Sequence, residues 1–230
     1  MLRVAPGNPV ILSGTAGEEL AVRLDRPGQE QPDPIIWQPL RGFDAASGGE
    51  KGEVRWLRFW LIAPSGAIAA SGALPADQSI VIRLPAEQTG LYALMTEAGP
   101  GSLGISSPTS RALMAVARSL EFEDPNEKLC FYVPPGADKL SLTTGGLDQQ
   151  VHMKVFDSAG DLRFQRDDFN VHSRQDTIEV PAGQDGKVWV VNLSTDTPPA
   201  RRAGRRTKIE FAEPLQGFVS PEPGRLVVLD

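Results

Sequence analysis

The residues best suited to hold a ligand lie in one short run, Arg55-Trp56-Leu57-Arg58-Phe59-Trp60-Leu61. Side chains alternate between the two faces of a strand, so Trp56, Arg58 and Trp60 would share one face and the apolar residues between them would enter a core. A Trp-Arg-Trp face suits sugar binding, because aromatic rings stack on pyranose faces while polar groups bond the hydroxyls. It also suits a protein interface, where Trp and Arg are enriched. The alternative is that the tryptophans pack beneath a long loop or the other half of the chain.

The densest charge in the chain is a basic run near the C-terminal end. It contains Arg201, Arg202, Arg205 and Arg206. Such a run is either a solvated hairpin tip or a contact for an anionic partner, such as an acidic protein, a glycan or a lipid head group. We predict partner binding at these four arginines.

A second candidate for partner binding is the longest irregular stretch, residues 26–52, which is rich in Pro, Gly and Gln. Insertions of this length between strands often form interfaces. Trp37 lies within it and could join the Trp-Arg-Trp face.

Sequence signatures of catalysis are missing. No Gly-x-Ser-x-Gly elbow, His-Glu-x-x-His motif or P-loop occurs. The two histidines are His152, in an alternating strand, and His172, in a polar run. A Ser-His-Asp set is defined by geometry and can come from distant residues. We predict a protein that is not an enzyme, and catalysis stays the third hypothesis.

Five aspartates surround one predicted hairpin: Asp157, Asp161, Asp167, Asp168 and Asp176. Calcium takes six to eight oxygen ligands, but the spacing here is not that of an EF-hand loop. Aspartate is also common in turns for its own hydrogen bonding. The sequence therefore predicts solvated turns, with no metal and no cofactor, and calcium binding is the alternative.

The single cysteine, Cys130, lies in the apolar run Leu129-Cys130-Phe131-Tyr132-Val133. It cannot form an intramolecular disulfide, and the run shows no electropositive, partly open setting of the kind that a reactive thiol needs. We expect a buried small hydrophobe.

Short apolar runs with a period of two, each closed by Gly, Pro, Asp or Asn, fill most of the chain. This pattern predicts antiparallel β-strands in sandwiches or barrels. The one candidate helix, residues 110–118, reads better as a strand because of its flanks.

An internal repeat organises these strands. Residues 59–66, 80–86 and 88–94 match residues 153–160, 177–183 and 184–191 in order: strand, Gly turn, strand, Pro-Ala turn, Gly, aromatic strand. We therefore predict an all-β protein of two tandem antiparallel, jelly-roll-like β-sandwich domains, residues 1–118 and 119–230, that touch without a flexible tether.

The second half resembles the bacterial pre-peptidase C-terminal domain and is similar to β-sandwich accessory modules found beside polysaccharide-acting enzymes. The matching segments are Phe131-Tyr132-Val133-Pro134-Pro135-Gly136, Leu140-Ser141-Leu142-Thr143-Thr144-Gly145-Gly146, Val155-Phe156-Asp157 with Gly160, and Ile178-Glu179-Val180-Pro181-Ala182-Gly183 before Gly186-Lys187-Val188-Trp189. The first half matches more loosely. The resemblance implies a non-catalytic, extracytoplasmic module, often in tandem.

Charge and hydropathy narrow the function further. The 230 residues carry a net charge of −6, so a nucleic-acid partner is not expected. No apolar stretch is long enough to span a membrane, and the first residues lack the core of a signal peptide.

We predict an extracytoplasmic binding or structural module, with a polysaccharide at Trp56, Arg58 and Trp60. The alternative is an accessory subunit of an assembly that docks through residues 26–52 and the arginine run.

Overall fold

The protein is built from antiparallel β-sheets, as predicted. The computed structural model describes residues 1–4, 6–26, 56–75, 78–97, 103–116, 119–122, 127–146, 151–168, 173–196, 207–215 and 217–226. Over these ranges the regular elements are strands, apart from one short 3-10 turn, η2 (Pro223–Arg225). The ambiguous stretch 110–118 contains a strand, Leu113–Val116, which confirms the strand interpretation there.

Within the described ranges, each half of the chain has nine strands. Those of the first half are β1 (Leu2–Val4), β2 (Val10–Gly14), β3 (Glu19–Arg26), β4 (Leu57–Ile62), β5 (Ile68–Leu74), β6 (Gln78–Pro85), β7 (Gly90–Thr96), β8 (Leu103–Ser106) and β9 (Leu113–Val116). Those of the second half are β10 (Ser119–Phe122), β11 (Glu127–Val133), β12 (Lys139–Gly146), β13 (Val151–Phe156), β14 (Leu162–Asp168), β15 (Arg174–Glu179), β16 (Lys187–Ser194), β17 (Thr207–Phe211) and β18 (Phe218–Ser220).

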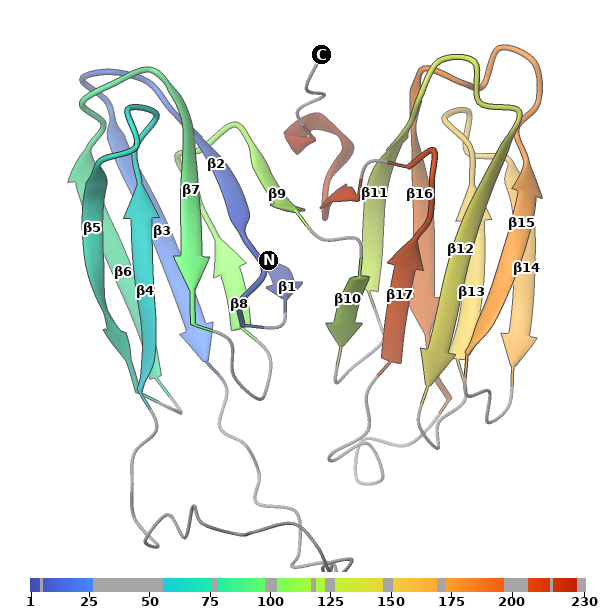
Figure 1. Cartoon of the computed structure of the whole chain (residues 1–230), viewed down its shortest axis with the longest axis horizontal. Coiled ribbons are helices and arrows are strands. Elements are labelled where there is room, and N and C mark those ends of the chain that lie inside the picture. Colours follow the sequence, from blue (N-terminus) through green and yellow to red (C-terminus); the bar gives the residue numbers. More distant parts are fainter. Residues whose placement is uncertain are drawn as a thin grey trace, which may run out of the picture.

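The strand order is that of a jelly roll in each half. One four-stranded sheet runs β1-β8-β3-β6 and faces strands β2-β7-β4-β5; the other runs β10-β17-β12-β15 and faces β11-β16-β13-β14. Adding nine to each strand number of the first half therefore reproduces the second half. Figure 1 shows the two halves side by side, with the C-terminal segment between β9 and β11.

A ten-stranded sheet passes through both halves in the order β14-β13-β16-β11-β18-β9-β2-β7-β4-β5. Its centre is an antiparallel pairing of β9 with β18, in which Val219 lies opposite Ala115 and Phe218 opposite Val116. We call two strands counterparts when their numbers differ by nine, as β9 and β18 do. If every strand is replaced by its counterpart and the order is reversed, the same ten-stranded order results. The two halves are therefore related by an approximate two-fold axis through the β9–β18 ladder. The buried apolar residues of both halves form one connected cluster. The predicted domain boundary between residues 118 and 119 therefore stays a prediction.

Local details repeat as well as strand order. A register shift interrupts the β4–β5 pairing at Leu61/Ile62 and the β13–β14 pairing at Val155/Phe156. The hairpin turn that follows contains Gly66 in one half and Gly160 in the other, with φ angles of 85° and 87°. That left-handed conformation favours glycine, which explains the Gly in each predicted turn.

The aromatic strand of the sequence repeat places one large buried ring in each half. Tyr92 on β7 and Trp189 on β16 are 1% and 0% exposed. Each donates its polar hydrogen to a backbone carbonyl of the preceding turn: Tyr92 Oη to Gln88 at 3.1 Å and Trp189 Nε1 to Gln184 at 2.9 Å. Each buried donor is satisfied in the same way, so Tyr and Trp are exchangeable at this position.

The edge strands β5 and β14 differ at a position opposite the buried side chains of β4 and β13. In the first half the Phe59 ring lies against Gly72, where an added Cβ would come within 2.8 Å of the ring. The registers make Arg166 the counterpart of Gly72. Its buried guanidinium bonds Asp176 and Thr144. A buried ion pair and an apolar contact thus fill equivalent space.

The position of Val219 leads to a stability prediction. Val219 is fully buried and lies between Phe131 of β11 and Ala115 of β9. Val219→Ala should lower the free energy of unfolding by about 2–3 kcal/mol, since two buried methyl groups are lost and a cavity remains. Val81→Ala, at a valine 50% exposed, should cost less than about 0.5 kcal/mol. Urea denaturation measures both, and equal losses would contradict a structural role for the β18 ladder.

Candidate functional site

The strand β4 presents the predicted face. Along it, Leu57, Phe59 and Leu61 are buried. The side chains that alternate with them point to the outer side of the ten-stranded sheet. Trp56, just before the strand, is 59% exposed. The Arg58 side chain is 68% exposed, and Trp60 is half-buried. We call Trp56, Arg58 and Trp60 the β4 platform.

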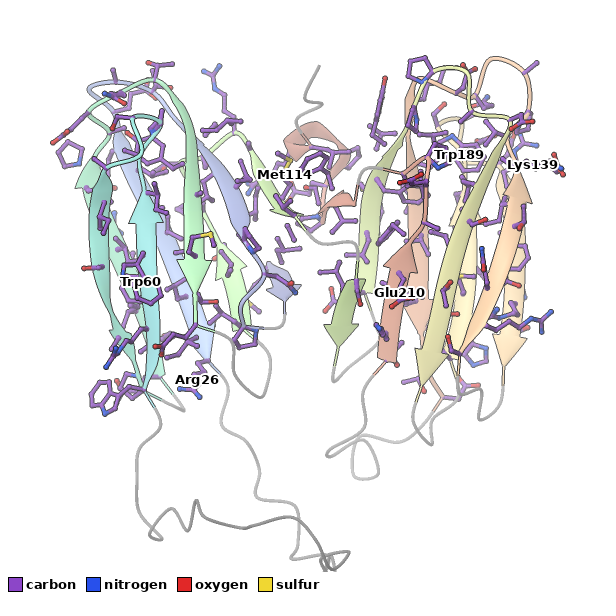
Figure 2. The ribbon with its side chains drawn as sticks, viewed as in Figure 1. Arg26, Trp60, Met114, Lys139, Trp189 and Glu210 are labelled. Carbon is purple, nitrogen blue, oxygen red and sulfur yellow. The ribbon has the colours of Figure 1, made fainter. Side chains whose placement is uncertain are left out.

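The neighbours of the β4 platform on β5 are small, and those on β7 and after it are larger. Trp60 lies opposite Ser71 of β5 and Met95 of β7. Arg58 lies opposite Ala73, and its Nη1 is 3.9 Å from Glu97 Oε1. At that distance the ion pair is loose, so the guanidinium keeps donors for another partner. Figure 2 shows Trp60 on the first half, well away from the buried Trp189 of the second.

The pseudo-equivalent surface of the second half is polar. From the paired registers, His152 takes the place of Arg58 and Lys154 that of Trp60. Lys154 is exposed and lies opposite Asn192 and Gln165. The same backbone therefore accepts a lysine where the first half carries an indole, so the fold itself does not require an aromatic ring at that place.

His152 is held between two carboxylates. Its Nδ1 is 2.7 Å from Asp167 Oδ1, across the β13–β14 pair, and its Nε2 is 3.1 Å from Asp196 Oδ2. The hydrogen bond from His152 lowers the pKa of the Asp167 carboxyl, with a smaller contribution from Gln165. Ser194 is the cross-strand neighbour of His152, but a carboxylate faces Nε2. This arrangement suits an imidazole that pairs with anions more than one that activates a hydroxyl.

Asp157, Asp161 and Asp176 pair with arginines. Asp157 is buried, and its Oδ2 accepts a hydrogen bond from Arg163 Nε at 2.6 Å. Its Oδ1 accepts from the backbone N–H groups of Ala159 and Asp161. Burial raises the pKa of Asp157, but these hydrogen bonds outweigh burial and the net pKa lies below the ordinary value. Within the described ranges, no three His, Cys, Asp or Glu side chains are placed to hold a metal ion.

Cys130 is buried, as expected for a small hydrophobe. Burial raises the pKa of its thiol above the ordinary value. A raised pKa keeps the thiol protonated and poorly nucleophilic near neutral pH.

Several predicted binding residues lie outside the described part of the chain. They are Trp37 and the rest of the 26–52 stretch beyond Arg26, and the arginines Arg201, Arg202, Arg205 and Arg206; His172, considered only for catalysis, lies outside it too. Their binding roles stay predictions. Arg26 itself ends β3 and donates from Nη1 to the Leu74 carbonyl at 3.2 Å.

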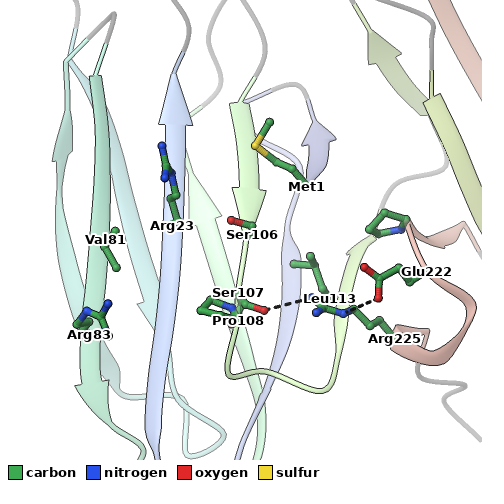
Figure 3. A pocket seen from close by; sticks show the side chains of 11 residues that line it. Met1, Arg23, Val81, Arg83, Ser106, Ser107, Pro108, Leu113, Glu222 and Arg225 are labelled. Carbon is green, nitrogen blue, oxygen red and sulfur yellow. Dashed lines mark hydrogen bonds and ion pairs between the residues drawn. The ribbon is translucent and has the colours of Figure 1, made fainter.

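A pocket that sequence reasoning missed lies on the other side of the first half. Its volume is about 320 Å³, and Arg23, Arg83 and Arg225 contribute to its lining (Figure 3). These arginines are far apart in the sequence, and each stands alone among residues typical of an exposed strand or turn. No local pattern could have joined them.

Comparisons with known proteins name no family. No family model matches the chain, and no curated protein matches it. A solved structure of the infectious bursal disease virus Gx strain aligns at 7% identity over 98% of this chain and 71% of that chain, with a TM-score of 0.20. The VP2 subviral particle of infectious bursal disease virus aligns at 9% identity over 94% of this chain and 64% of that chain, with a TM-score of 0.15. Scores this low carry no argument about fold or function.

In the described ranges, no helix has the length and apolar character to cross a bilayer.

The Asp157 turn predicts a pH-dependent stability. The folded-state pKa of Asp157 lies below its ordinary 3.8, so its contribution is present above that value and is lost as the pH falls through the folded-state pKa. Asp157→Asn should destabilise the protein at about pH 6, and the difference from wild type should shrink towards about pH 2. Chemical denaturation across this range measures it. Asp138→Asn, at an exposed aspartate, is the control, and a difference independent of pH would contradict the role of the charge.

Proposed function

We propose that the chain is a non-catalytic, extracytoplasmic binding module that holds a polysaccharide against the β4 platform. The observation that carries the proposal is the half-buried and exposed pair Trp60 and Trp56 on the outer face of β4, where the second half places Lys154 in the position of Trp60. Because the fold does not require an indole at this position, we take Trp60 to be there for contact with a ligand. The resemblance of the second half to accessory modules of polysaccharide-acting enzymes supports the same class of function and a periplasmic or secreted location.

The chemistry of the β4 platform fits a sugar chain. Trp56 and Trp60 are four residues apart, which in extended backbone is about 13 Å. That separation lets two rings contact different sugar units of one polymer. The flat apolar face of an indole packs on the C–H face of a pyranose, and Arg58 between them can donate to hydroxyl oxygens. The small neighbours Ser71 and Ala73 leave room beside the rings.

The absence of catalysis is part of the proposal. The strongest catalytic arrangement in the described residues is His152 with Asp167, and the other ring nitrogen of His152 faces Asp196. A general base needs a free nitrogen directed at the group it deprotonates. Nε2 is buried beside Asp196 and makes no hydrogen bond with any described group, so no described hydroxyl is placed for it to deprotonate, which favours binding over hydrolysis.

The test is a titration with soluble polysaccharides of different linkage, namely mixed-linkage β-glucan, xylan and galactomannan. The wild type should retard in affinity gels that contain one of them and release heat in calorimetry. Trp60→Lys, which copies the residue of the second half, should weaken binding by about tenfold or more, since the loss of a stacking contact of about 1.4 kcal/mol changes affinity tenfold. Trp56→Ala should act in the same direction.

The matched control is Leu162→Ala, which removes a half-exposed apolar side chain from β14 at the other end of the sheet. It should bind as the wild type does. The proposal fails if none of the three polysaccharides binds, or if the tryptophan variants bind as tightly as the control.

A second candidate function, as subunit of a larger assembly, is favoured by the edge strand β5. This strand ends the ten-stranded sheet and reads Ile-Ala-Ala-Ser-Gly-Ala-Leu, with no charge. Its counterpart β14 ends the other side and reads Leu-Arg-Phe-Gln-Arg-Asp-Asp. Charged side chains are a usual protection of edge strands, and β5 lacks them.

The occupant that fits the β5 edge best is a second copy, paired β5 to β5 about a two-fold axis. Pairing of two such strands brings only small or apolar side chains opposite one another and no like charges. The sheet is already joined edge to edge by the β9–β18 ladder, so a second junction of the same kind would extend it. The predicted contacts at residues 26–52 and at the arginine run would then serve other subunits.

The edge predicts a dimer that a single charge disrupts. Ala69→Arg copies Arg163, its counterpart on β14, and should convert a concentration-dependent dimer into a monomer. Light scattering after gel filtration measures the mass. Ala159→Arg, in an exposed turn of the second half, should remain dimeric. A wild type that is monomeric at every concentration would remove this second candidate.

A further inference from the structure

The pocket of about 320 Å³ lies between the outer face of the sheet β1-β8-β3-β6 and the C-terminal segment, residues 221–225. Its volume falls within the range of about 300–1,000 Å³ that is usual for small-molecule sites. The floor comes from β3, β6 and β8, and the wall comes from the chain that follows β18. Residues of both halves are therefore needed to form the pocket.

The floor places two arginines near hydroxyl groups. Arg23 of β3 lies opposite Val81 of β6 on one side and opposite Ser106 of β8 on the other. Arg83 of β6 lies two residues along from Val81, so its side chain emerges on the same face. Both are exposed, at 51% and 63% of the side-chain area.

The wall contributes the third guanidinium in a fixed position. Arg225 Nη1 donates to the Ser107 carbonyl at 3.2 Å, and its Nε is 3.0 Å from Glu222 Oε2 (Figure 3). The first contact ties the C-terminal segment to the residue that follows β8, and the second is an ion pair within the segment itself. They also hold the guanidinium at the rim of the pocket, where only 27% of its side chain is exposed.

The lining is basic in an acidic protein. Its charged side chains are three arginines and one carboxylate, Glu222, while the whole chain has a net charge of −6. Two acids lie beside the floor: Asp25 is 3.4 Å from Arg23, and Glu19 is 2.7 Å from Arg83. Arg23 also donates from Nη2 to Ser79 Oγ at 3.4 Å. Each guanidinium has five N–H donors, so these contacts leave others for a ligand. Exposed ion pairs contribute little, so a ligand can compete with them.

The second half shows that the fold does not require these arginines. By register, Thr143 takes the place of Arg23 and Thr177 that of Arg83. Glu210, which pairs with Lys208, takes the place of Ser106, so these three positions of the second half carry no arginine. The basic floor is confined to the half that the C-terminal segment covers.

We propose that this pocket binds a small organic anion, of the size of a monosaccharide, that carries a carboxylate or phosphate group. Arg23 and Arg83 bind the anionic group, Arg225 adds charge from the rim, and Ser106 bonds a neutral oxygen. Val81, Pro108 and Pro221 contact the apolar part of the ligand. The site is separate from the β4 platform, and the proposal does not depend on polysaccharide binding there.

Calorimetry with galacturonate and glucose 6-phosphate tests the proposal, with galactose and glucose as the neutral counterparts. At least one anion should bind, its neutral counterpart should not, and added salt should weaken binding because exposed charges are screened. The double variant Arg23→Thr, Arg83→Thr installs the residues of the second half and should lower affinity by about tenfold or more. Lys139→Thr, which removes an exposed cation paired with Glu179 on the second half, should change affinity less than about twofold.

Competition identifies the source of the anion. Polygalacturonate that displaces galacturonate shows that the pocket accepts an acidic group on a polymer, and failure to displace it shows that the pocket takes free small molecules. Trp60→Lys should leave anion binding unchanged, which separates this site from the β4 platform. The proposal is overturned if neither anion binds, if the neutral sugars bind equally well, or if the double variant binds as tightly as the wild type.

Discussion

The ladder between β9 and β18 is the contact on which the arrangement of the whole molecule depends. A three-residue strand from near the end of the chain lies between β9 and β11 and turns two sheets into one. Both strands would otherwise present unpaired N–H and C=O groups at an edge, and pairing satisfies them together. The chain then crosses to the first half, where Arg225 bonds the Ser107 carbonyl and closes one side of the pocket. The same C-terminal stretch therefore joins the central sheet, through β18, and lines the pocket, through the residues that follow β18.

The approximate two-fold symmetry provides an internal comparison that a single chain rarely offers. Positions that must be alike for the fold remain alike: the glycines at positive φ in the hairpin turns, the register shift in β4 and β13, and the large buried aromatic of β7 and β16. Outward positions differ freely, as Trp60 and Lys154 show. Because equivalent backbone positions carry both residues, the sheet itself requires neither of them.

Much of the fold was predictable because it depends on local patterns. Alternation along β4 placed Leu57, Phe59 and Leu61 in the core and the β4 platform outside, as the structure has it. The apolar run around Cys130 predicted burial, and the flanks of residues 110–118 correctly favoured a strand. The sequence repeat coincides with β4–β7 and β13–β16. The buried pairing of Arg166 with Asp176, by contrast, could be found only from the coordinates.

The sequence alone determined the strand content, the faces of the strands and the position of the glycine turns. Each depends on residues a few positions apart, and a period of two or a glycine at positive φ is visible without tertiary contacts. Only the tertiary structure decided that β18 joins the halves, that His152 meets both Asp167 and Asp196, and that Arg23, Arg83 and Arg225 share a pocket. These residues come together because strands that are far apart in the sequence pair with one another. Which strands pair is determined by how the sheets close around a common core.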